Sequence, residues 1–282
     1  GCRAYLSPWH DEKGRYVAIG RCNIGAVSLN IPLIIRLVQL EHPDNWRTAF
    51  WTELDERLEV IREFFKKRYD IIRRQKCSSN PLAFTQGGFY EGTKDPDDEV
   101  GDLVRYMTAS FGITALDEAT FLWTGKRLLE EGGAFSEEVL RHLQARINVF
   151  KKEDGWLYAI YGTPAESLCG LQVEQFRKMY GIVENVSDRP YVSNSFHCHV
   201  TEDLTPIEKQ DLEGRFWELC NGGKIQYVRY PIDYNIEAIK SLIRRAMDLG
   251  YYEGVNLSLA YCDDCGHQEL EMDVCPICGS RN

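Results

Sequence analysis

The chain has 282 residues, of which 44% are hydrophobic and 27% charged, and its formal net charge is −10. This length can bury the core of one large α/β domain or two medium ones, and the composition excludes wholesale disorder. The acidic balance argues against coating a nucleic-acid backbone, and no apolar run is long enough to span a membrane. We therefore expect no direct nucleic-acid partner and no membrane partner.

The ten cysteines favour a reducing compartment. Four of them form a paired motif near the C-terminus, whereas the others are scattered through a long chain that can form its own core. No signal peptide is visible at the start of the sequence. This usage is typical of metal-binding or catalytic thiols rather than a disulfide scaffold, and it predicts a cytoplasmic protein.

The first half of the sequence predicts strands and long helices. Residues 16–30 are interpreted as a strand or strand pair, and residues 46–74 as a long helix because apolar residues recur every three or four positions. Residues 80–101 read as an irregular connection. Two further helices are predicted near residues 103–129 and 136–151.

The second half alternates regularly. The predicted strands are residues 156–161, 191–200, 224–230 and 255–260, with helices between them. Thr163 and Thr205 are each predicted to cap a helix, with Glu166 and Glu208 closing the capping boxes, and Asn235 is predicted to cap a helix that ends at Gly250. Counting residues 16–30 once, five strands separated by helices predict a mostly parallel sheet that binds ligands at the carboxyl ends of its strands.

The most specific local motif is a pair of CxxC sequences. Cys262, Cys265, Cys275 and Cys278 have the spacing of a four-cysteine site that closes a tetrahedron around Zn²⁺. We interpret this site as structural, because four sulfur ligands leave no open position on the metal. The alternative, two redox disulfides, would need a thioredoxin-like context that the sequence does not show.

Two other segments carry polar groups where a substrate of a parallel sheet could bind. Residues 163–167 follow a strand and start a helix, so backbone N–H groups with the Thr163 and Ser167 hydroxyls could bind a phosphate; the alternative is an ordinary cap. In the predicted strand 191–200, Asn194 and Ser195 lie in the carboxyl-terminal half. His197 and His199 would point the same way, but without a third metal ligand they are better interpreted as core or pocket-wall residues.

Taken together, several strings resemble the anaerobic (class III) ribonucleoside-triphosphate reductases, which are glycyl radical enzymes. On spacing alone, Cys2 would be a small buried side chain and Asn23 a turn residue. The resemblance extends over essentially the whole chain. The strings are residues 1–8 (GCRAYLSP), 20–25 (GRCNIG), 110–113 (SFGI), 161–169 (YGTPAESLC), 193–197 (SNSFH), 221–223 (NGG) and the cysteine motif.

The resemblance implies an α/β fold that is half of a ten-stranded glycyl-radical-enzyme barrel. Residues 1–255 would be the catalytic barrel portion, with a finger loop that carries Cys2, and residues 256–282 the zinc ribbon. It implies that Cys2 becomes a thiyl radical and that Asn23 hydrogen-bonds the ribose hydroxyls. Substrate-binding residues would come from two segments: Thr163, Pro164, Ala165, Glu166 and Ser167, and Asn194, Ser195 and His197.

The resemblance also implies cofactors and partners. A glycyl radical outside these 282 residues would be installed by an activating enzyme that uses S-adenosylmethionine and an iron–sulfur cluster. The substrates would be ribonucleoside triphosphates, with nucleotide effectors, and Asn23 favours formate as reductant over a thiol. A homodimer is the expected assembly.

Two alternatives are open. Another glycyl radical enzyme, such as a formate-lyase-like acyltransferase, typically has adjacent cysteines at the finger tip and generally lacks a cysteine ribbon, whereas Cys2 is flanked by Gly1 and Arg3. A non-catalytic zinc-ribbon module is disfavoured by the net charge and by the predicted phosphate site. Zinc content without nucleotide affinity would favour that module.

The family's radical glycine lies in an Arg-x-x-Gly-Tyr-like string beyond the cysteine ribbon, and the 282 residues contain no such string. We therefore expect the isolated chain, a fragment by this comparison, to be inactive, because nothing in it can generate the thiyl. The test is incubation with activase, S-adenosylmethionine, formate and a ribonucleotide. Formation of a deoxyribonucleotide would contradict the expectation.

Overall fold

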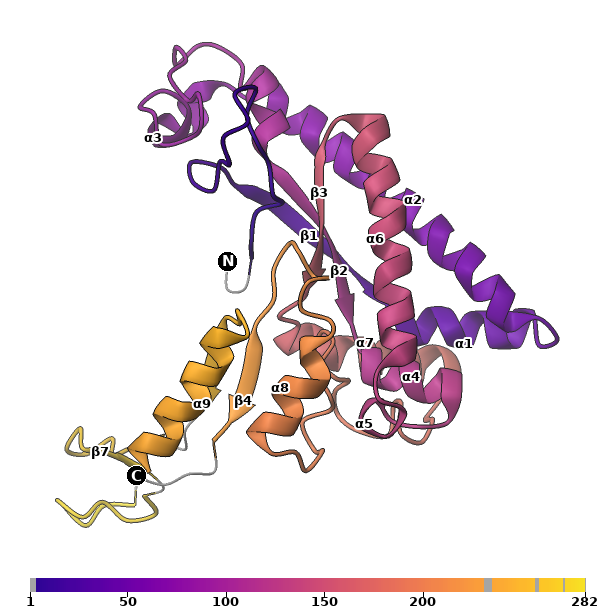
Figure 1. The fold of residues 1–282 in the computed structure, drawn as a ribbon, viewed down its shortest axis with the longest axis vertical. Helices are drawn as coiled ribbons and strands as arrows, with labels where there is room; N and C mark the ends of the chain where they lie inside the picture. Colours follow the sequence, from indigo (N-terminus) through magenta and orange to yellow (C-terminus); the bar gives the residue numbers. More distant parts are fainter. Residues whose placement is uncertain (1–3, 231–234, 257–258, 271, 282) are drawn as a thin grey trace. The chain divides into compact units, whose positions relative to one another are not determined.

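The computed structural model describes residues 4–230, 235–256, 259–270 and 272–281 (Figure 1). Cys2 therefore lies outside the described residues. The chain divides into two compact units, Gly1–Glu202 with Arg215–Lys224, and Asp203–Gly214 with Ile225–Asn282. The predicted boundary between residues 255 and 256 stays a prediction.

The first unit is built on a three-stranded parallel sheet. Its strands are β1 (Asn23–Asn30), β2 (Thr108–Thr114) and β3 (Leu157–Gly162), in the order β1-β2-β3. Helices connect the strands, as parallel pairing requires. They are α1 (Ile31–Glu41), α2 (Trp46–Arg73), α3 (Pro81–Phe84), α4 (Leu116–Thr124), α5 (Leu128–Glu131), α6 (Ala134–Asp154) and, after β3, α7 (Glu166–Tyr180), with 3₁₀ turns at Cys77–Ser79 and Gly101–Tyr106.

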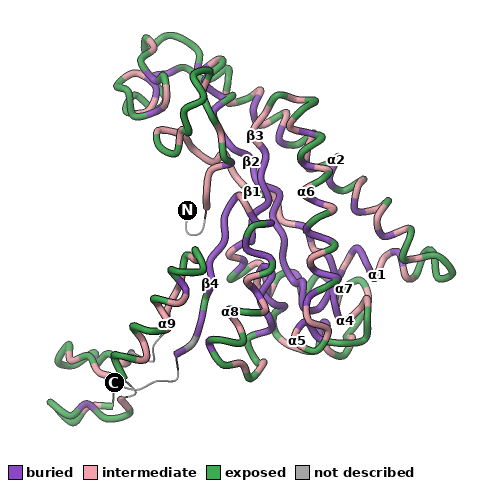
Figure 2. The backbone as a smooth tube through the Cα atoms, in the orientation of Figure 1, coloured by how far each residue is buried: buried purple, intermediate pink, exposed green. Residues whose placement is uncertain are grey.

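One face of this sheet is an aromatic core. Phe111 of β2 is fully buried, with its ring centroid 5.2 Å from that of Phe65 on α2 and 6.0 Å from that of Phe150 on α6. Helices α2 and α6 lie along this side of the strands in Figure 1, and β2 and β3 are mostly buried in Figure 2. Burial of these large side chains is the main stabilising contribution to this unit.

The opposite face carries small and polar side chains. Side chains alternate along a strand, so Thr108, Ser110 and Gly112 of β2 all lie on this side. The segment that begins at Ala4 contacts the same face, since Ser7 N–H donates to Thr108 Oγ1 at 3.2 Å. Beyond β3, the Gly223 carbonyl accepts from Gly162 N–H at 2.8 Å.

The second unit contains two small sheets. Strands β4 (Gln226–Arg229) and β5 (Glu253–Asn256) pair in parallel, and β6 (Leu259–Tyr261) and β7 (Gln268–Leu270) form an antiparallel pair. Its helices are α8 (Pro206–Gly214) and α9 (Ile236–Asp248). None of the described helices in either unit is long and apolar enough to cross a bilayer.

The predicted α/β class with a parallel sheet is confirmed, as are helices α2 and α6 and strands β3 and β4. The capping box of α8 is also confirmed: Glu208 N–H donates to Thr205 Oγ1 at 3.3 Å, and Thr205 N–H donates to Glu208 Oε2 at 2.9 Å. Asn235 caps α9, because its Oδ1 accepts from Ala238 N–H at 3.1 Å.

Two expectations about secondary structure were wrong, and one helix was not predicted. Residues 108–114 form the central strand β2 rather than part of a helix, because large and small residues alternate there with a period of two. Residues 191–200 form no strand, since their backbone hydrogen bonds go to the start of α4 and to local turns. Helix α1 was not predicted, although Pro32 stands in its first turn, where proline is tolerated.

Candidate functional site

At the carboxyl end of the sheet, two hydroxyls meet over a glycine. Ser28 Oγ of β1 and Thr163 Oγ1, just beyond β3, are 2.6 Å apart. A methyl group built on Gly112 of β2 would lie 2.4 Å and 2.3 Å from these two oxygens. The absence of a side chain at position 112 is therefore what allows the hydroxyl pair to form.

The predicted capping role of Thr163 was wrong. Helix α7 begins at Glu166 with Ala165 as its N-cap, which makes no side-chain cap hydrogen bond. Thr163 instead turns toward the sheet and is buried, whereas Glu166 and Ser167 are exposed on the first turn of α7. An uncapped helix start has backbone N–H groups and the positive end of the helix dipole available to an anion.

Asn23 lies at the start of β1, on the polar face. Its Nδ2 donates to Ser110 Oγ at 2.7 Å, and its Oδ1 accepts from Gly25 N–H at 2.7 Å. These two bonds use half of the hydrogen-bonding capacity of an amide. Asn23 contacts Ser110, and Thr163 lies over Gly112, two residues further along the same strand. Along the strand, the position of Asn23 and the position of Thr163 are therefore separated by roughly 7 Å.

Residues 193–197 form a loop beside the start of α7. Asn194 Oδ1 accepts from Ala165 N–H at 3.4 Å. Ser195 has a left-handed backbone (φ 57°), is 1% exposed, and its Oγ has no hydrogen-bond partner among the described residues. A methyl group on Gly162 would lie 2.5 Å from this Oγ. His197 is buried next to Phe196 in the same loop.

Two buried carboxylates at the start of α4 hold this loop. Glu118 accepts from Ser193 N–H at 2.9 Å and from Ser193 Oγ at 2.7 Å. Asp117 forms an ion pair with Arg127 and accepts from His199 N–H at 3.2 Å. Burial, with a smaller contribution from the neighbouring Asp117, raises the pKa of Glu118 to about 7.

The structure thus brings Thr163, Ala165, Asn194 and Ser195 together at one end of the sheet, and places Asn23 further along the same face. Their assigned roles stay predictions. Sequence reasoning missed Ser28, Gly112, Ser193 and the two carboxylates. The alternation of residues 108–114 was the signal that could have placed Gly112 on this face.

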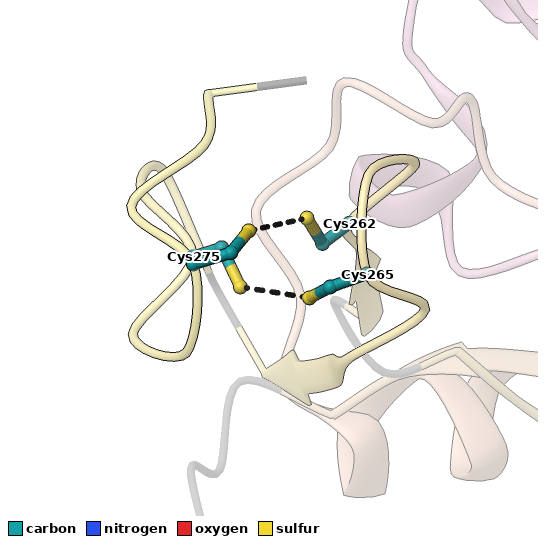
Figure 3. A group of neighbouring side chains, drawn as sticks. Cys262, Cys265 and Cys275 are labelled. Carbon is teal, nitrogen blue, oxygen red and sulfur yellow. Dashed lines mark hydrogen bonds between the residues drawn. The ribbon is translucent and has the colours of Figure 1, made fainter.

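The cysteine motif forms a compact cluster in the second unit. The sulfurs of Cys262, Cys265, Cys275 and Cys278 all lie within 4.8 Å of one another. Cys262 is 3.5 Å from Cys278, and Cys265 is 3.5 Å from Cys275, too far apart for disulfide bonds. Figure 3 shows the labelled cysteines directed toward one another. Within the described residues this is the one group of three or more such side chains close enough to hold a metal ion.

Two glycines shape the backbone around the cluster. Gly266 and Gly279 have left-handed backbones that let the chain turn back after each CxxC half. The pKa shifts of the thiols differ in direction: that of Cys275 is lowered, desolvation being outweighed by backbone hydrogen bonds from Cys278 and Ile277, whereas those of Cys265 and Cys278 are raised. Four such sulfurs match the ligand set of a structural Zn²⁺, so the cluster fits a zinc ribbon.

Comparison with known proteins identifies the family. A sequence model described as "Anaerobic ribonucleoside-triphosphate reductase" matches residues 1–282. The anaerobic ribonucleoside-triphosphate reductases of Salmonella typhimurium and Enterobacteria phage T4 are 31% and 30% identical over the whole chain, which covers 40% and 46% of their lengths. The fold is similar to that of the anaerobic ribonucleotide reductase from Thermotoga maritima solved with glycerol in the active site (TM-score 0.72, 18% identity, 99% of this chain and 43% of that one).

The fold is therefore that of the anaerobic ribonucleotide reductases as a class. More particularly, the chain belongs to the anaerobic ribonucleoside-triphosphate reductase family, and it spans less than half the length of these relatives.

If the cluster is a structural zinc site, the purified chain should contain about one zinc per molecule. Cys275→Ser should lose most of that zinc, because an alcohol is a poor substitute for a thiolate ligand. Metal analysis checks this. Cys22→Ser is the matched control, since Cys22 is half-buried in the first unit and should not affect the zinc content. Full zinc retention in Cys275→Ser would contradict the assignment.

Proposed function

We propose that these residues form part of an anaerobic reductase that converts ribonucleoside triphosphates to 2′-deoxyribonucleoside triphosphates. The observation that carries this proposal is the match of all 282 residues to the reductase family. The arrangement of the polar sheet face supports it, because hydroxyls, an amide and an uncapped helix start occur on one side of the same sheet.

In the proposed reaction Cys2 acts as a thiyl radical. It takes the hydrogen atom from C3′ of the ribose, and the 2′-hydroxyl leaves as water after protonation. Formate is oxidised to CO₂ and supplies the two electrons and the proton that form the new C2′–H bond. The hydrogen returns to C3′ from the Cys2 thiol. The radical derives from a glycyl that an S-adenosylmethionine-dependent activase generates.

The described chain next to Cys2 is consistent with this role. Ala4 pairs with Gly223, and Tyr5 N–H donates to the Gly222 carbonyl at 2.8 Å. Ser7 N–H donates to Thr108 Oγ1 on the polar face. The segment that follows Cys2 is thus held by backbone hydrogen bonds against the sheet face that carries Asn23 and Ser28.

The spacing of Asn23 and the Thr163 corner supports the proposal of a nucleotide site. We assign the Asn23 amide to the ribose hydroxyls, because a neutral group can both donate and accept there. Thr163, Ser195 and the N–H groups at the start of α7 would bind the phosphates. The roughly 7 Å between the positions of Asn23 and Thr163 along the strand is comparable to the distance from a ribose to its 5′-phosphates. Pro164, Glu166, Ser167, Asn194 and His197 complete the proposed site.

The remaining assignments follow from family membership. We propose a structural Zn²⁺ in the ribbon, formate as reductant, control by nucleotide effectors, a radical-generating activase as partner, and a homodimer. Structures of the Thermotoga maritima enzyme carry dATP and CTP, according to their titles, which supports nucleotide partners for this chain.

Cys2→Ala in the whole activated protein should abolish deoxyribonucleotide formation, because no other group can take the C3′ hydrogen. The measurement is product formation under anaerobic conditions with formate. Cys22→Ala is the control, because Cys22 is also near the N-terminus. Burial raises the pKa of the Cys22 thiol, so this group should stay protonated and unreactive. The variant should therefore retain activity. Turnover by Cys2→Ala would overturn the proposed mechanism.

Gly112→Ala should weaken nucleotide binding, because the added methyl would displace both Ser28 Oγ and Thr163 Oγ1. We expect the KM for the triphosphate to rise by about tenfold or more, since misplacement of a positioning group by even 1 Å has large effects. Gly170→Ala, on α7, is the matched control: its methyl would meet only the Pro190 carbonyl, at 3.7 Å. Equal KM values for the two variants would contradict the role of the corner.

A further inference from the structure

The loop that carries Asn194 and Ser195 has no regular secondary structure of its own, so something else must fix it. Its main anchor is residue 193, which is buried and hydrogen-bonded to the start of α4 from several sides. Ala115 N–H donates to the Ser193 carbonyl at 3.1 Å, and Asp117 N–H donates to Ser193 Oγ at 3.3 Å. The N–H groups of the first turn of α4, which have no partners within the helix, are used here to hold the loop.

Glu118 completes this anchor. Its side chain is almost fully buried, and its two oxygens accept from the N–H and the hydroxyl of the same residue, Ser193. A two-point contact fixes both the position and the rotation of Ser193, whereas a single hydrogen bond would leave rotation about it. Burying a carboxylate is unfavourable unless it is hydrogen-bonded in this way.

From Ser193 the contact continues to the helix that follows β3. The next residue, Asn194, accepts from Ala165 N–H at 3.4 Å, and Ser195 places its partnerless hydroxyl against Gly162. Leu116 N–H donates to the Ser195 carbonyl at 3.4 Å. A shift of Ser193 would therefore move both side chains relative to the start of α7.

We propose that Glu118 is a positioning residue that fixes Ser193 and thereby the Asn194 and Ser195 groups that contact the triphosphate. This inference rests on the proposed function. Glu118 touches no substrate in it; it acts through the loop, so its removal should affect ground-state binding more than the radical steps.

The test compares Glu118→Ala and Glu118→Gln in the whole activated protein. Glu118→Ala should raise the KM for a ribonucleoside triphosphate by about tenfold or more with a much smaller change in kcat, the signature of lost binding. Glu118→Gln should keep most of the wild-type affinity, because its carbonyl can accept from Ser193 N–H and its NH₂ can donate to Ser193 Oγ, although the hydroxyl proton then loses its acceptor. A Gln variant as impaired as the Ala variant would overturn the proposal.

Asp154→Ala is the matched control. Asp154 is also a nearly buried carboxylate, but it pairs with Arg62 and accepts from the Tyr158 hydroxyl at 3.0 Å on the aromatic side of the sheet. The Asp154→Ala substitution should destabilise the protein without changing the KM for the ribonucleoside triphosphate. The same KM increase in both Ala variants would show that Glu118 acts only through general stability, which would also overturn the proposal.

Hydrogen exchange separates this inference from the proposed function. Glu118→Ala should accelerate exchange at the Ser193 amide and in residues 193–195, because it removes the acceptor of the Ser193 N–H. The faster exchange is expected even if the wild-type protein fails to reduce nucleotides. That failure would count against the proposed function and not against the role of Glu118. Unchanged exchange at Ser193 would overturn the role of Glu118.

Discussion

The two faces of strand β2 determine how the rest of the first unit is built: one face must be packed by large apolar side chains, and the other must stay free of them. On one side Phe111 packs between aromatic rings of α2 and α6, which fixes the strand in the core. On the other side the same strand carries the hydroxyls of Thr108 and Ser110, and Gly112, which has no side chain. A rigid aromatic layer thus supports a polar surface that lacks large side chains. Pre-organised polar groups on a fixed scaffold are what a small-molecule site requires.

The polar groups at the carboxyl end of this sheet come from segments that are distant in sequence. Ser28, Gly112, Thr163 and the loop at residues 193–195 meet because parallel strands end at one edge and because α4 starts there. Each depends on a neighbour: Thr163 on the empty space at Gly112, and the loop on two carboxylates. Small changes at any of these positions would therefore be transmitted to the others.

Elements with strong local signals could be predicted from the sequence. The apolar spacing of α2, the capping box at Thr205 and the paired cysteines all depend on residues close together in the chain, and the structure has each of them. Strand β2 was misassigned because residues 103–129 as a whole are apolar enough to suggest a helix, and its period of two extends over only seven residues. Thr163 was assigned as a cap because the local pattern fits a capping box, but its actual partner, Ser28, is 135 residues away. Pairings of this kind depend on tertiary structure and leave no local trace.

The turn between β2 and α4 has one residue in an unusual conformation. Ala115 is fully buried and adopts a left-handed backbone with φ 59°, and from this position its N–H reaches the Ser193 carbonyl. The left-handed region is unfavourable for residues with a Cβ atom, by roughly 1–2 kcal/mol, and most of all for β-branched ones. Natural variation at this position should accordingly be confined to alanine, glycine and asparagine. A valine or threonine there would strain this turn and weaken the hydrogen bond between the start of α4 and the loop it supports.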